Sequence, residues 1–419
     1  MERYSEYKDS GVKWLGEIPS HWEVFRNKDI FHECKKSVGK NSNNYTLLSL
    51  SKKGVVIRNM DDGGKFPAEF DTYKVVEPGD FIFCFFDVDE TPRAVGLSSE
   101  YGMITGAYTV LRQSIANSQY LYYYYLSIDD AKALKPLYTG LRKTVPLNAF
   151  MSMQIFLPPK AEQDAIVRYL DTATSEIDKA IAMQQKMIDL LNERKQIIIK
   201  NAVTKGLDEN VEMKESGVEW IGKIPKHWEV RRGKFLFRVV NEYSTTGQEE
   251  LLTVSDRTGI TPRSMKNVNM FMSESLIGYK KCQKGDICSN IMWMWHGAVG
   301  VTEYNGVISP SYGVYRQIAV NYDNKYLDYM LRLPRLVEVY GICSTGLTES
   351  RLRLYPDDFM NIQFFIPPVE EQKSIVLQIQ KQITDIEKSI RNAENLITLL
   401  QERKQIIINE VVTGKVRVS

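Results

Sequence analysis

The stretch AEQDAIVRYLDTATSEIDKAIAMQQKMIDLLNERKQIIIKNAV, from Ala161 to Val203, predicts one unbroken helix. It contains no proline or glycine, and small or apolar residues recur in it at alternating gaps of four and three. This spacing is typical of a coiled-coil seam, which is narrower than the buried face of an ordinary surface helix. At about 1.5 Å per residue the helix would extend about 65 Å, so we expect it to lie against a partner.

A second copy of this helix near the C-terminus is the expected partner. LLNERKQIIIKNAVT (Leu190–Thr204) returns as LLQERKQIIINEVVT (Leu399–Thr413), a shift of 209 residues. Both helices are entered through similar words, IFLPPKAEQ (Ile155–Gln163) and FFIPPVEEQ (Phe364–Gln372). The prolines predict an extended approach, and Glu and Gln suit the first turn of a helix. The sequence therefore predicts an internal duplication.

The predicted seams occupy equivalent positions in the two helices. In the first helix they are Ile166, Leu170, Ala173, Ile177, Ala180, Gln184, Met187, Leu191, Arg194 and Ile198. In the second they are Ile375, Ile379, Gln382, Ile386, Ser389, Ala393, Leu396, Leu400, Arg403 and Ile407. The polar seam members could set the register of the pair or leave room for other subunits.

The composition is that of an ordinary globular protein. The 419 residues have 43% hydrophobic and 25% charged content and a net charge of +2, enough for two or three domains without a global polybasic signature. Any nucleic-acid surface must therefore be local. Five scattered cysteines predict reduced thiols, neither a disulfide framework nor a zinc site. With no signal peptide and no apolar run of about 18 residues, we expect a soluble, intracellular protein without membrane contact.

The duplication extends to the region in front of each helix. KDSGVKWLGEIPSHWEV (Lys8–Val24) returns as KESGVEWIGKIPKHWEV (Lys214–Val230), a shift of 206 residues, and predicts a compact turn packed by indole rings. Beside these indoles His21 and His227 are expected to pack, not to catalyse. Short apolar runs separated by turn residues then predict a strand-rich globule.

Three features of the globules have both a structural and a functional interpretation. Asp80 and Asp286 follow glycine before an apolar strand, which predicts turns capped by the carboxylate. The tyrosine-rich YLYYYYL (Tyr120–Leu126) matches YLDYMLR (Tyr326–Arg332), and core packing is favoured over base stacking. The acids Asp87, Asp89 and Glu90 are a weak divalent-ion motif, and we interpret them as a solvated or base-reading loop.

The loops differ between the two copies, whereas the frame does not. CFFDVDETPR (Cys84–Arg93) stands against NIMWMWHG (Asn290–Gly297). Before each Pro-Pro pair, a Thr-Gly turn is followed by basic residues, Arg142 and Lys143 in one copy and Arg351 and Arg353 in the other. Such a turn suits phosphate contact, and a solvated basic loop is the equal alternative. Different loops on a duplicated frame are what the reading of two different short targets would require.

The motifs of common enzymes are absent from the sequence. There is no G-x-x-x-x-G-K-[ST] phosphate loop and no Asn- or Asp-Pro-Pro-Tyr methyl-transfer motif. The cysteines have no histidine placed to activate them. We therefore expect a chain that is not an enzyme.

The ordered set SGVxWxGxIPxHWE, PPxxEQ and a long helix ending in ERKQIII…VT, all duplicated, resembles the specificity (S) subunit of type I restriction–modification systems. The resemblance covers essentially the whole chain. It implies an α+β fold: two strand-rich target-recognition domains in tandem, each followed by a long helix, with the helices packed as an antiparallel coiled coil. The implied domains are residues 1–160 and 207–369 for target recognition and 161–206 and 370–419 for the conserved helices.

The resemblance also implies a function in host defence in the cytoplasm. Each globule would read one half of a bipartite, asymmetric site on double-stranded DNA, and the helices would hold the halves at a fixed distance. Two methylation (M) subunits would bring S-adenosylmethionine, and restriction (R) subunits would bring ATP-driven translocation and Mg-dependent cleavage. No catalytic residue, cofactor or metal is expected in this chain.

The candidate DNA contacts are basic and aromatic residues of the loops. In the first globule they are Lys52, Lys53, Arg58, Arg93, Arg142 and Lys143, and in the second Arg257, Arg263, Trp293, Trp295, His296, Arg351 and Arg353. Two other classes of function stay open. A stand-alone nuclease or methyltransferase would be active alone with a metal or a methyl donor, and a coiled-coil scaffold would bind protein without selecting a DNA sequence.

Overall fold

The computed structural model describes residues 2–59, 67, 69–91, 93–266, 275–348 and 351–418. The chain forms two compact units, Met1–Lys186 with Ala393–Ser419 and Met187–Asn392. The unit boundaries fall inside the two long helices, α4 (Lys160–Lys205, 46 residues) and α8 (Val369–Val412, 44 residues). We call the residues before α4 the first globule and those between α4 and α8 the second globule. The four predicted domain ranges remain a prediction.

The first globule is built on a four-stranded antiparallel sheet of order β4-β11-β8-β9. Its strands are Phe31–Glu33, Thr109–Gln113, Phe81–Phe83 and Val95–Leu97 in that order. Antiparallel pairs surround it: β1 with β2 (Tyr7–Asp9, Glu17–Pro19), β3 with β12 (Glu23–Arg26, Gln154–Leu157), β5 with β6 (Leu48–Ser51, Gly54–Ile57) and β7 with β10 (Lys74–Val76, Gly102–Ile104). The helices are α1 (Asn27–Ile30), α2 (Ser118–Asp130) and α3 (Leu147–Ser152).

The second globule repeats this topology strand for strand. Its four-stranded sheet has the order β16-β23-β20-β21, with strands Phe237–Val239, Gly313–Gln317, Ile287–Ser289 and Val299–Val301. The surrounding pairs are β13 with β14 (Met213–Glu215, Lys223–Pro225), β15 with β24 (Glu229–Arg232, Gln363–Ile366), β17 with β18 (Leu252–Ser255, Gly259–Pro262) and β19 with β22 (Lys280–Cys282, Gly306–Ile308). The helices are α5 (Asn324–Leu331), α6 (Pro334–Cys343) and α7 (Pro356–Asn361). The predicted fold class is confirmed.

A buried carboxylate shapes the same turn in both globules, as predicted for Asp80 and Asp286. Asp80 Oδ2 accepts from the backbone of Glu77 at 2.8 Å, and Asp80 also binds the guanidinium of Arg112. Asp286 binds Arg316 through both oxygens, at 2.7 and 2.8 Å. Each buried charge is therefore paired and hydrogen-bonded, which is the condition for tolerating it in a core.

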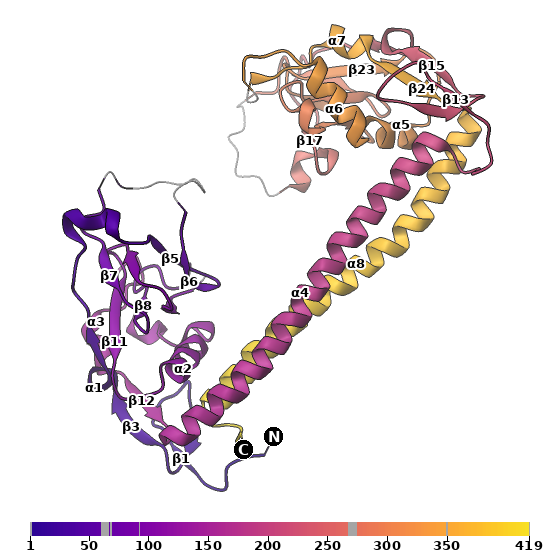
Figure 1. Ribbon diagram of the computed structural model, residues 1–419. Coiled ribbons are helices and arrows are strands. Elements are labelled where there is room, and N and C mark those ends of the chain that lie inside the picture. The colour runs from indigo at the N-terminus through magenta and orange to yellow at the C-terminus, as the bar shows by residue number, and fades with distance from the viewer. Residues whose placement is uncertain are drawn as a thin grey trace. The chain divides into compact units, whose positions relative to one another are not determined.

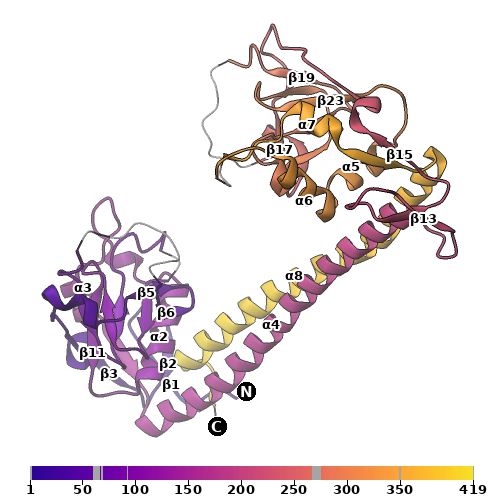
Figure 2. The same ribbon diagram turned by 45° about the horizontal axis from the view of Figure 1, so that its top comes forward.

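The two long helices pack antiparallel inside each unit. In the first unit, Lys404 of α8 binds Asp178 of α4. In the second, Lys195 of α4 binds Glu387 of α8, and Gly206, just past the end of α4, lies against Glu371 in the first turn of α8. Figures 1 and 2 show α4 and α8 side by side in both units.

The seam of this pair follows a period of 3.6 and not the predicted strict heptad. The positions in α4 that recur at this period and are buried or half-buried are Ile166, Leu170, Thr174, Ile177, Ile181, Gln184, Ile188, Leu191, Lys195, Ile199 and Ala202. Those in α8 are the repeat equivalents Ile375, Ile379, Ile383, Ile386, Ile390, Ala393, Ile397, Leu400, Lys404, Ile408 and Val411. The predicted members that are exposed instead are Met187, Arg194, Gln382, Ser389, Leu396 and Arg403, whereas the predicted members Ala173, Ala180, Ile198 and Ile407 are buried or half-buried. The reason is that an ordinary helix drifts by about 20° per heptad from a 3.5-residue repeat.

The duplicated words around each Pro-Pro pair anchor a globule to the start of its helix. Glu162, in the first turn of α4, accepts from the indole Nε1 of Trp22 at 3.1 Å and lies 2.8 Å from Nε2 of His21. In the second globule Glu371 holds the equivalent groups of Trp228 and His227 at 3.1 and 2.7 Å. Both histidines are exposed and act through these hydrogen bonds, which differs from the packing role that was predicted for them.

Tyrosines also bind each globule to the end of the other repeat's helix. Tyr120 of α2 donates to the carbonyl of Val412, at 3.3 Å. Its equivalent in α5, Tyr326, donates to the carbonyl of Val203 at 2.7 Å. Both rings are fully buried, so the aromatic faces serve packing, as predicted. Each globule is thus fastened both to the start of one long helix and to the end of the other.

Candidate nucleic-acid interface

Three equivalent segments of each globule carry the predicted DNA contacts. In the first globule they are the β5–β6 hairpin, the loop of residues 84–93 and the turn of residues 138–144. In the second they are the β17–β18 hairpin, the loop of residues 290–297 and the turn of residues 344–353. We call the last of these in each globule the Thr-Gly turn.

In the first globule the loop and the Thr-Gly turn are joined by backbone hydrogen bonds. The amide of Asp87 donates to the carbonyl of Arg142 at 2.8 Å, and that of Val145 donates to Phe85 at 2.8 Å. Asp87 and Lys143 have positive φ angles, 48° and 43°. Non-glycine residues in this region cost about 1–3 kcal/mol, and such strain tends to gather at functional sites. The turn is therefore a constrained feature of the surface.

The acidic loop and the basic Thr-Gly turn, interpreted separately from the sequence, neutralise each other. Arg142 binds Asp87 at 2.6 Å, and Lys143 binds Asp89 at 2.9 Å. The hydrogen bond from Lys143 lowers the pKa of Asp89, and that to Asp87 raises the pKa of Arg142. Asp87 and Asp89, interpreted from the sequence as part of a solvated or base-reading loop, are therefore ion-paired at the surface, and their reading of bases stays a prediction. Exposed pairs of this kind are weak, so a phosphate can compete for either cation.

The other basic residues of the first globule differ in accessibility. Lys52 and Lys53 are exposed at the tip of the hairpin. Arg58 is half-buried, and its backbone amide donates to Leu47 at 2.9 Å. Arg93 is only 19% exposed and binds Asp129 and Asp130 of α2, at 3.4 and 2.8 Å. Arg93 therefore has a structural task, whereas the two lysines present their charges to solvent.

In the second globule the loop presents a stack of aromatic rings. Trp293 is 54% exposed, and its ring lies 5.2 Å from His296, which in turn lies 3.9 Å from the ring of Trp295. The indole of Trp295 donates to the carbonyl of Met292 at 3.0 Å, which fixes its orientation. The loop is joined to the following Thr-Gly turn by the amide of Leu354, which donates to Ile291 at 3.0 Å. Aromatic faces of this kind can stack on bases.

A cavity of about 550 Å³ opens between the hairpin and this aromatic loop. Arg263 and Trp293 line it, together with Asn290 and Tyr312, whose side chains are hydrogen-bonded to each other at 2.9 Å. Arg263 and Trp293, 30 residues apart in the sequence, thus meet at one site. Asn290 and Tyr312 were not foreseen, because nothing in their local sequence distinguishes them from packing residues.

The remaining predicted residues of the second globule are not among those that line this cavity. Arg257 is exposed in the hairpin turn, where Arg332 of α5's C-cap holds the carbonyls of residues 256 and 257. Arg351 is exposed and Arg353 is half-buried. The backbone of Arg353 pairs with that of Thr345. All predicted contact residues therefore lie on the three segments or, for Arg58 and Arg263, directly after a hairpin, and their contact with DNA stays a prediction.

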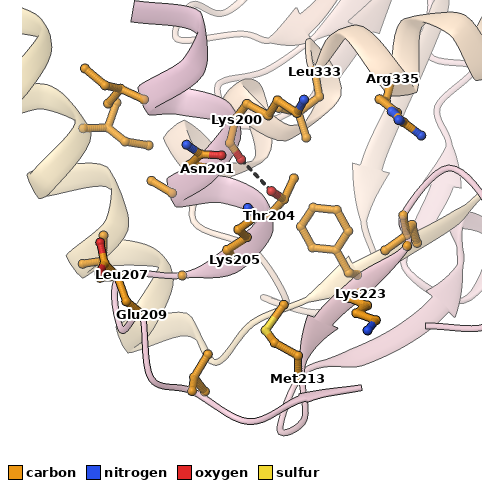
Figure 3. Close-up of a pocket in the computed structure, with 18 of the residues that line it drawn as sticks. Lys200, Asn201, Thr204, Lys205, Leu207, Glu209, Met213, Lys223, Leu333 and Arg335 are labelled. Carbon is orange, nitrogen blue, oxygen red and sulfur yellow. Dashed lines mark hydrogen bonds between the residues drawn. The ribbon is translucent and has the colours of Figure 1, made fainter. Parts of the chain in front are cut away.

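A larger cavity lies elsewhere, at the end of α4 in the second unit. It has a volume of about 1060 Å³ and is lined by the last turns of α4, the following linker, the β14 region and the start of α6. Figure 3 shows Lys200, Lys205, Lys223 and Arg335 around it, with Thr204 donating to the carbonyl of Lys200 at 2.7 Å. None of the predicted DNA contacts lines it. Acidic neighbours, Asp208 and Glu209, offset its cations, so we assign it no ligand.

Across the described residues, no group of three or more His, Cys, Asp or Glu side chains is placed to hold a metal ion. None of the helices in this part of the chain is long and apolar enough to cross a membrane.

The chain is similar over its whole length to a known protein of Methanocaldococcus jannaschii. It is 24% identical to the chain named as the specificity subunit of the type I restriction enzyme MjaX, and the match covers 98% of each chain. It is 25% identical to the type I restriction enzyme MjaVIII specificity subunit of the same organism, over 64% of this chain and 63% of the relative. No protein-family model matches.

A solved structure supports the fold independently. A chain from a study of complex assembly and conformational transition in the type I restriction–modification system superimposes with a TM-score of 0.66. This match covers 95% of the present chain and 99% of the solved one, at 14% sequence identity. The resemblance found in the sequence is confirmed.

Proposed function

We propose that this chain is the specificity subunit of a type I restriction–modification complex and that each globule reads one half of a bipartite site on double-stranded DNA. One observation carries the proposal. The two globules share a topology and are anchored through equivalent residues, such as Tyr120 and Tyr326, yet their interface loops differ in length and chemistry. A common frame with different reading loops suits the recognition of two unlike half-sites.

The interface loops supply the two kinds of contact that DNA recognition needs. Exposed cations such as Lys52, Lys53 and Arg257 suit phosphates, which set affinity and its dependence on salt. The stacked rings at Trp293 and the cavity beside them suit base edges. The first globule offers charge and the second offers aromatic surface, so we expect the half-sites to be unlike.

The helices would serve as a spacer between the two readers. Two modules that dock on one face of a duplex need centres separated by about one helical turn, about 34 Å, or a multiple of it. Removing three turns, 11 residues, at equivalent places in both helices would shorten the pair by about 16 Å, or about five base pairs. We expect the preferred spacer to shorten or binding to be lost. An unchanged spacer would contradict the spacer role.

Each unit has an exposed apolar strip that suits a methylation subunit. In the second unit it consists of Met187, Leu190 and Ile197 on α4, and in the first of the repeat equivalents Leu396, Leu399 and Ile406 on α8. The spacing places each set on one face of its helix. Two equivalent strips support the binding of two methylation subunits, one to each unit.

The strips can be tested separately by charge. Leu190→Glu and Leu399→Glu should each remove one methylation subunit, with Asn192→Glu and Gln401→Glu as exposed controls on other faces of the same helices. Native mass spectrometry of the co-expressed complex reports the stoichiometry. Retention of both subunits by both leucine variants would overturn the assignment of the strips.

The chemistry of the complex would then reside in its partners. The methylation subunits would bind S-adenosylmethionine, and restriction subunits would add ATP- and Mg-dependent translocation and cleavage. The present chain would select the sequence without catalysis, in the cytoplasm, as part of host defence.

Mapping methylated adenines in cells with and without this gene tests the proposed function. We expect a bipartite motif to lose its methylation when the gene is deleted and to regain it on complementation. Replacing residues 1–159 by the corresponding part of another specificity subunit should change one half of the motif only. An unchanged methylation map would contradict the proposal.

A further inference from the structure

Two leucines at the tips of the Thr-Gly turns have no task within their globules. Leu141 is 103% exposed and Leu347 is 94% exposed, which makes them the two most exposed large apolar side chains of the described residues. Single exposed leucines are common on protein surfaces and need no explanation. These two, however, occupy the same position in the repeats, 206 residues apart, after the shared pair Thr-Gly.

The surrounding sequence makes this coincidence informative. After Thr139-Gly140-Leu141 the chain continues RKTVPLNAF, and after Thr345-Gly346-Leu347 it continues TESRLRLYPDDF. The second turn is three residues longer, and the residues that follow the leucine are unlike. The leucine has therefore been kept at the tip although its neighbours and the size of the turn have changed.

Both tips are held in place by reciprocal backbone hydrogen bonds. Thr139 and Thr144 exchange bonds of 2.8 and 3.0 Å, and Thr345 and Arg353 exchange two bonds of 2.9 Å. Gly140 has a φ of +68°, which favours glycine. A Cβ on Gly346 would lie 2.5 Å from the carbonyl oxygen of Arg351, so only glycine permits this close approach. Each leucine is thus presented on a closed turn and can meet a partner at little cost in backbone entropy.

The charge and position of the turns indicate which partner they meet. Arg142 and Lys143 directly follow Leu141, and Arg351 follows Leu347 within the same turn. Each turn is bonded to the loop that carries the other predicted DNA contacts, through Val145 to Phe85 and through Leu354 to Ile291. An apolar tip beside cations suits a duplex, whose phosphates attract the cations and whose bases offer thymine methyls and apolar step edges.

We infer that Leu141 and Leu347 each make an apolar contact with a base of the DNA, one in each half-site. This inference rests on the proposed function. The cations would bind the phosphates of the duplex, and the leucine would enter the groove between the two phosphate backbones. Because a leucine carries no charge, its contribution to affinity is independent of salt, in contrast to that of Arg142.

The test uses the full chain in complex with its methylation subunits. The probe is a duplex with the bipartite motif found by mapping methylated adenines, and dissociation constants are measured at several salt concentrations. Leu141→Ser and Leu347→Ser should each weaken binding about tenfold, within the range that burial of one leucine can supply. The slope of log affinity against log salt concentration should not change, whereas Arg142→Ala should flatten it.

Val320→Ser is the matched control. Val320 is 82% exposed in the second globule, so it matches the two leucines in exposure. It differs from them in position, because the carbonyl of the neighbouring Asn321 accepts a hydrogen bond of 2.9 Å from Gln372 at the start of α8. This variant should bind like the wild type, and all three serine variants should keep the wild-type melting temperature, because no described contact is lost.

Each half-site can be assigned to one leucine. The loss of DNA affinity caused by Leu141→Ser should vanish on a duplex in which one half-site is scrambled. The loss of affinity caused by Leu347→Ser should vanish on a duplex in which the other half-site is scrambled. Wild-type affinity of both leucine variants would overturn the inference, as would loss of methylation subunits from them. If the wild-type complex did not prefer the mapped duplex, the proposed function would fail first.

Discussion

Lys404 donates to both carboxylate oxygens of Asp178, at 2.7 Å each, and joins α8 to α4 within the first unit. The repeat equivalents Lys195 and Glu387 form the same pair within the second unit. In both helices the lysine belongs to the duplicated word ERKQIII and lies at a seam position. The internal duplication is therefore expressed as a repeated contact between the helices.

The Lys404–Asp178 pair should contribute a small, measurable coupling. The two side chains are 30% and 57% exposed, so solvent screens them, and we expect about 0.2–1 kcal/mol from a double-mutant cycle with alanine. Urea unfolding followed by helical circular dichroism provides the measurement. The cycle on Lys195 and Glu387 should give a similar value. Zero coupling in both cycles would show that the seam lysines are merely solvated.

Tyr326→Phe should destabilise the second unit by about 0.5–1.5 kcal/mol, because it removes a buried hydrogen bond to Val203 without removing the ring. The matched control is Tyr120→Phe in the first unit, whose bond to Val412 is longer, 3.3 Å against 2.7 Å. We expect a smaller loss there. Thermal unfolding of the two variants would contradict this account if Tyr120→Phe proved the more costly.

Arg316→Ala should destabilise the second globule by about 3–5 kcal/mol, because it leaves the carboxylate of Asp286, 1% exposed, without a counterion. Glu242 also contacts Arg316, at 3.5 Å, but is largely exposed. Glu242→Ala should therefore cost less than about 1 kcal/mol. Equal unfolding free energies for the two variants would argue against a buried charge at Asp286.

Tyr123 should give the first unit a sensitivity to alkaline pH. Burial, together with the hydrogen bond to Asp171, raises the pKa of its hydroxyl from 10.0 to about 12. Because folding raises this pKa, the contribution of the hydroxyl to the free energy of unfolding is complete below pH 10 and is lost as the pH rises through about 12. The difference in the free energy of unfolding between Tyr123→Phe and the wild type should therefore shrink between these two pH values. A difference constant from pH 9 to 12 would contradict the shift.

Arg142 and Arg93 should separate DNA contact from structural support. Arg142→Ala removes an exposed cation, so it should reduce the salt slope of DNA binding by about one. Arg93→Ala leaves the buried Asp129 with one cation fewer, so it should lower the melting temperature and leave the slope unchanged. Titrations with duplex DNA at several salt concentrations, beside melting curves, provide both readouts. A larger change in the salt slope for Arg93→Ala than for Arg142→Ala would reverse these roles.

Much of the architecture could be predicted because it depends on local sequence motifs that occur twice in the chain. The apolar period predicts the helices, the Gly-Asp turns predict the strands after them, and the shared words predict two equivalent halves. The strict heptad failed because α-helices keep close to 3.6 residues per turn over this length, which brings Lys195 and Lys404 into the seam in place of Arg194 and Arg403.

The candidate interface could be predicted only in part, because its electrostatics depend on distant residues. Composition and loop divergence indicate which segments face a target. Asp87 and Arg142, however, are 55 positions apart, and only the folded backbone makes them a pair. The same holds for Arg93, which α2 diverts into a structural ion pair, and for Asn290 with Tyr312 in the cavity.

Secondary structure and the duplication thus follow from the order of residues, since they depend on periodicity and on short motifs. The order of residues does not determine the partner of each charge or the face that each side chain presents. Nor does it determine that the two leucines at the turn tips are exposed. These depend on chain segments that meet only after folding, when burial and backbone hydrogen bonds fix which groups are paired and which are left to solvent.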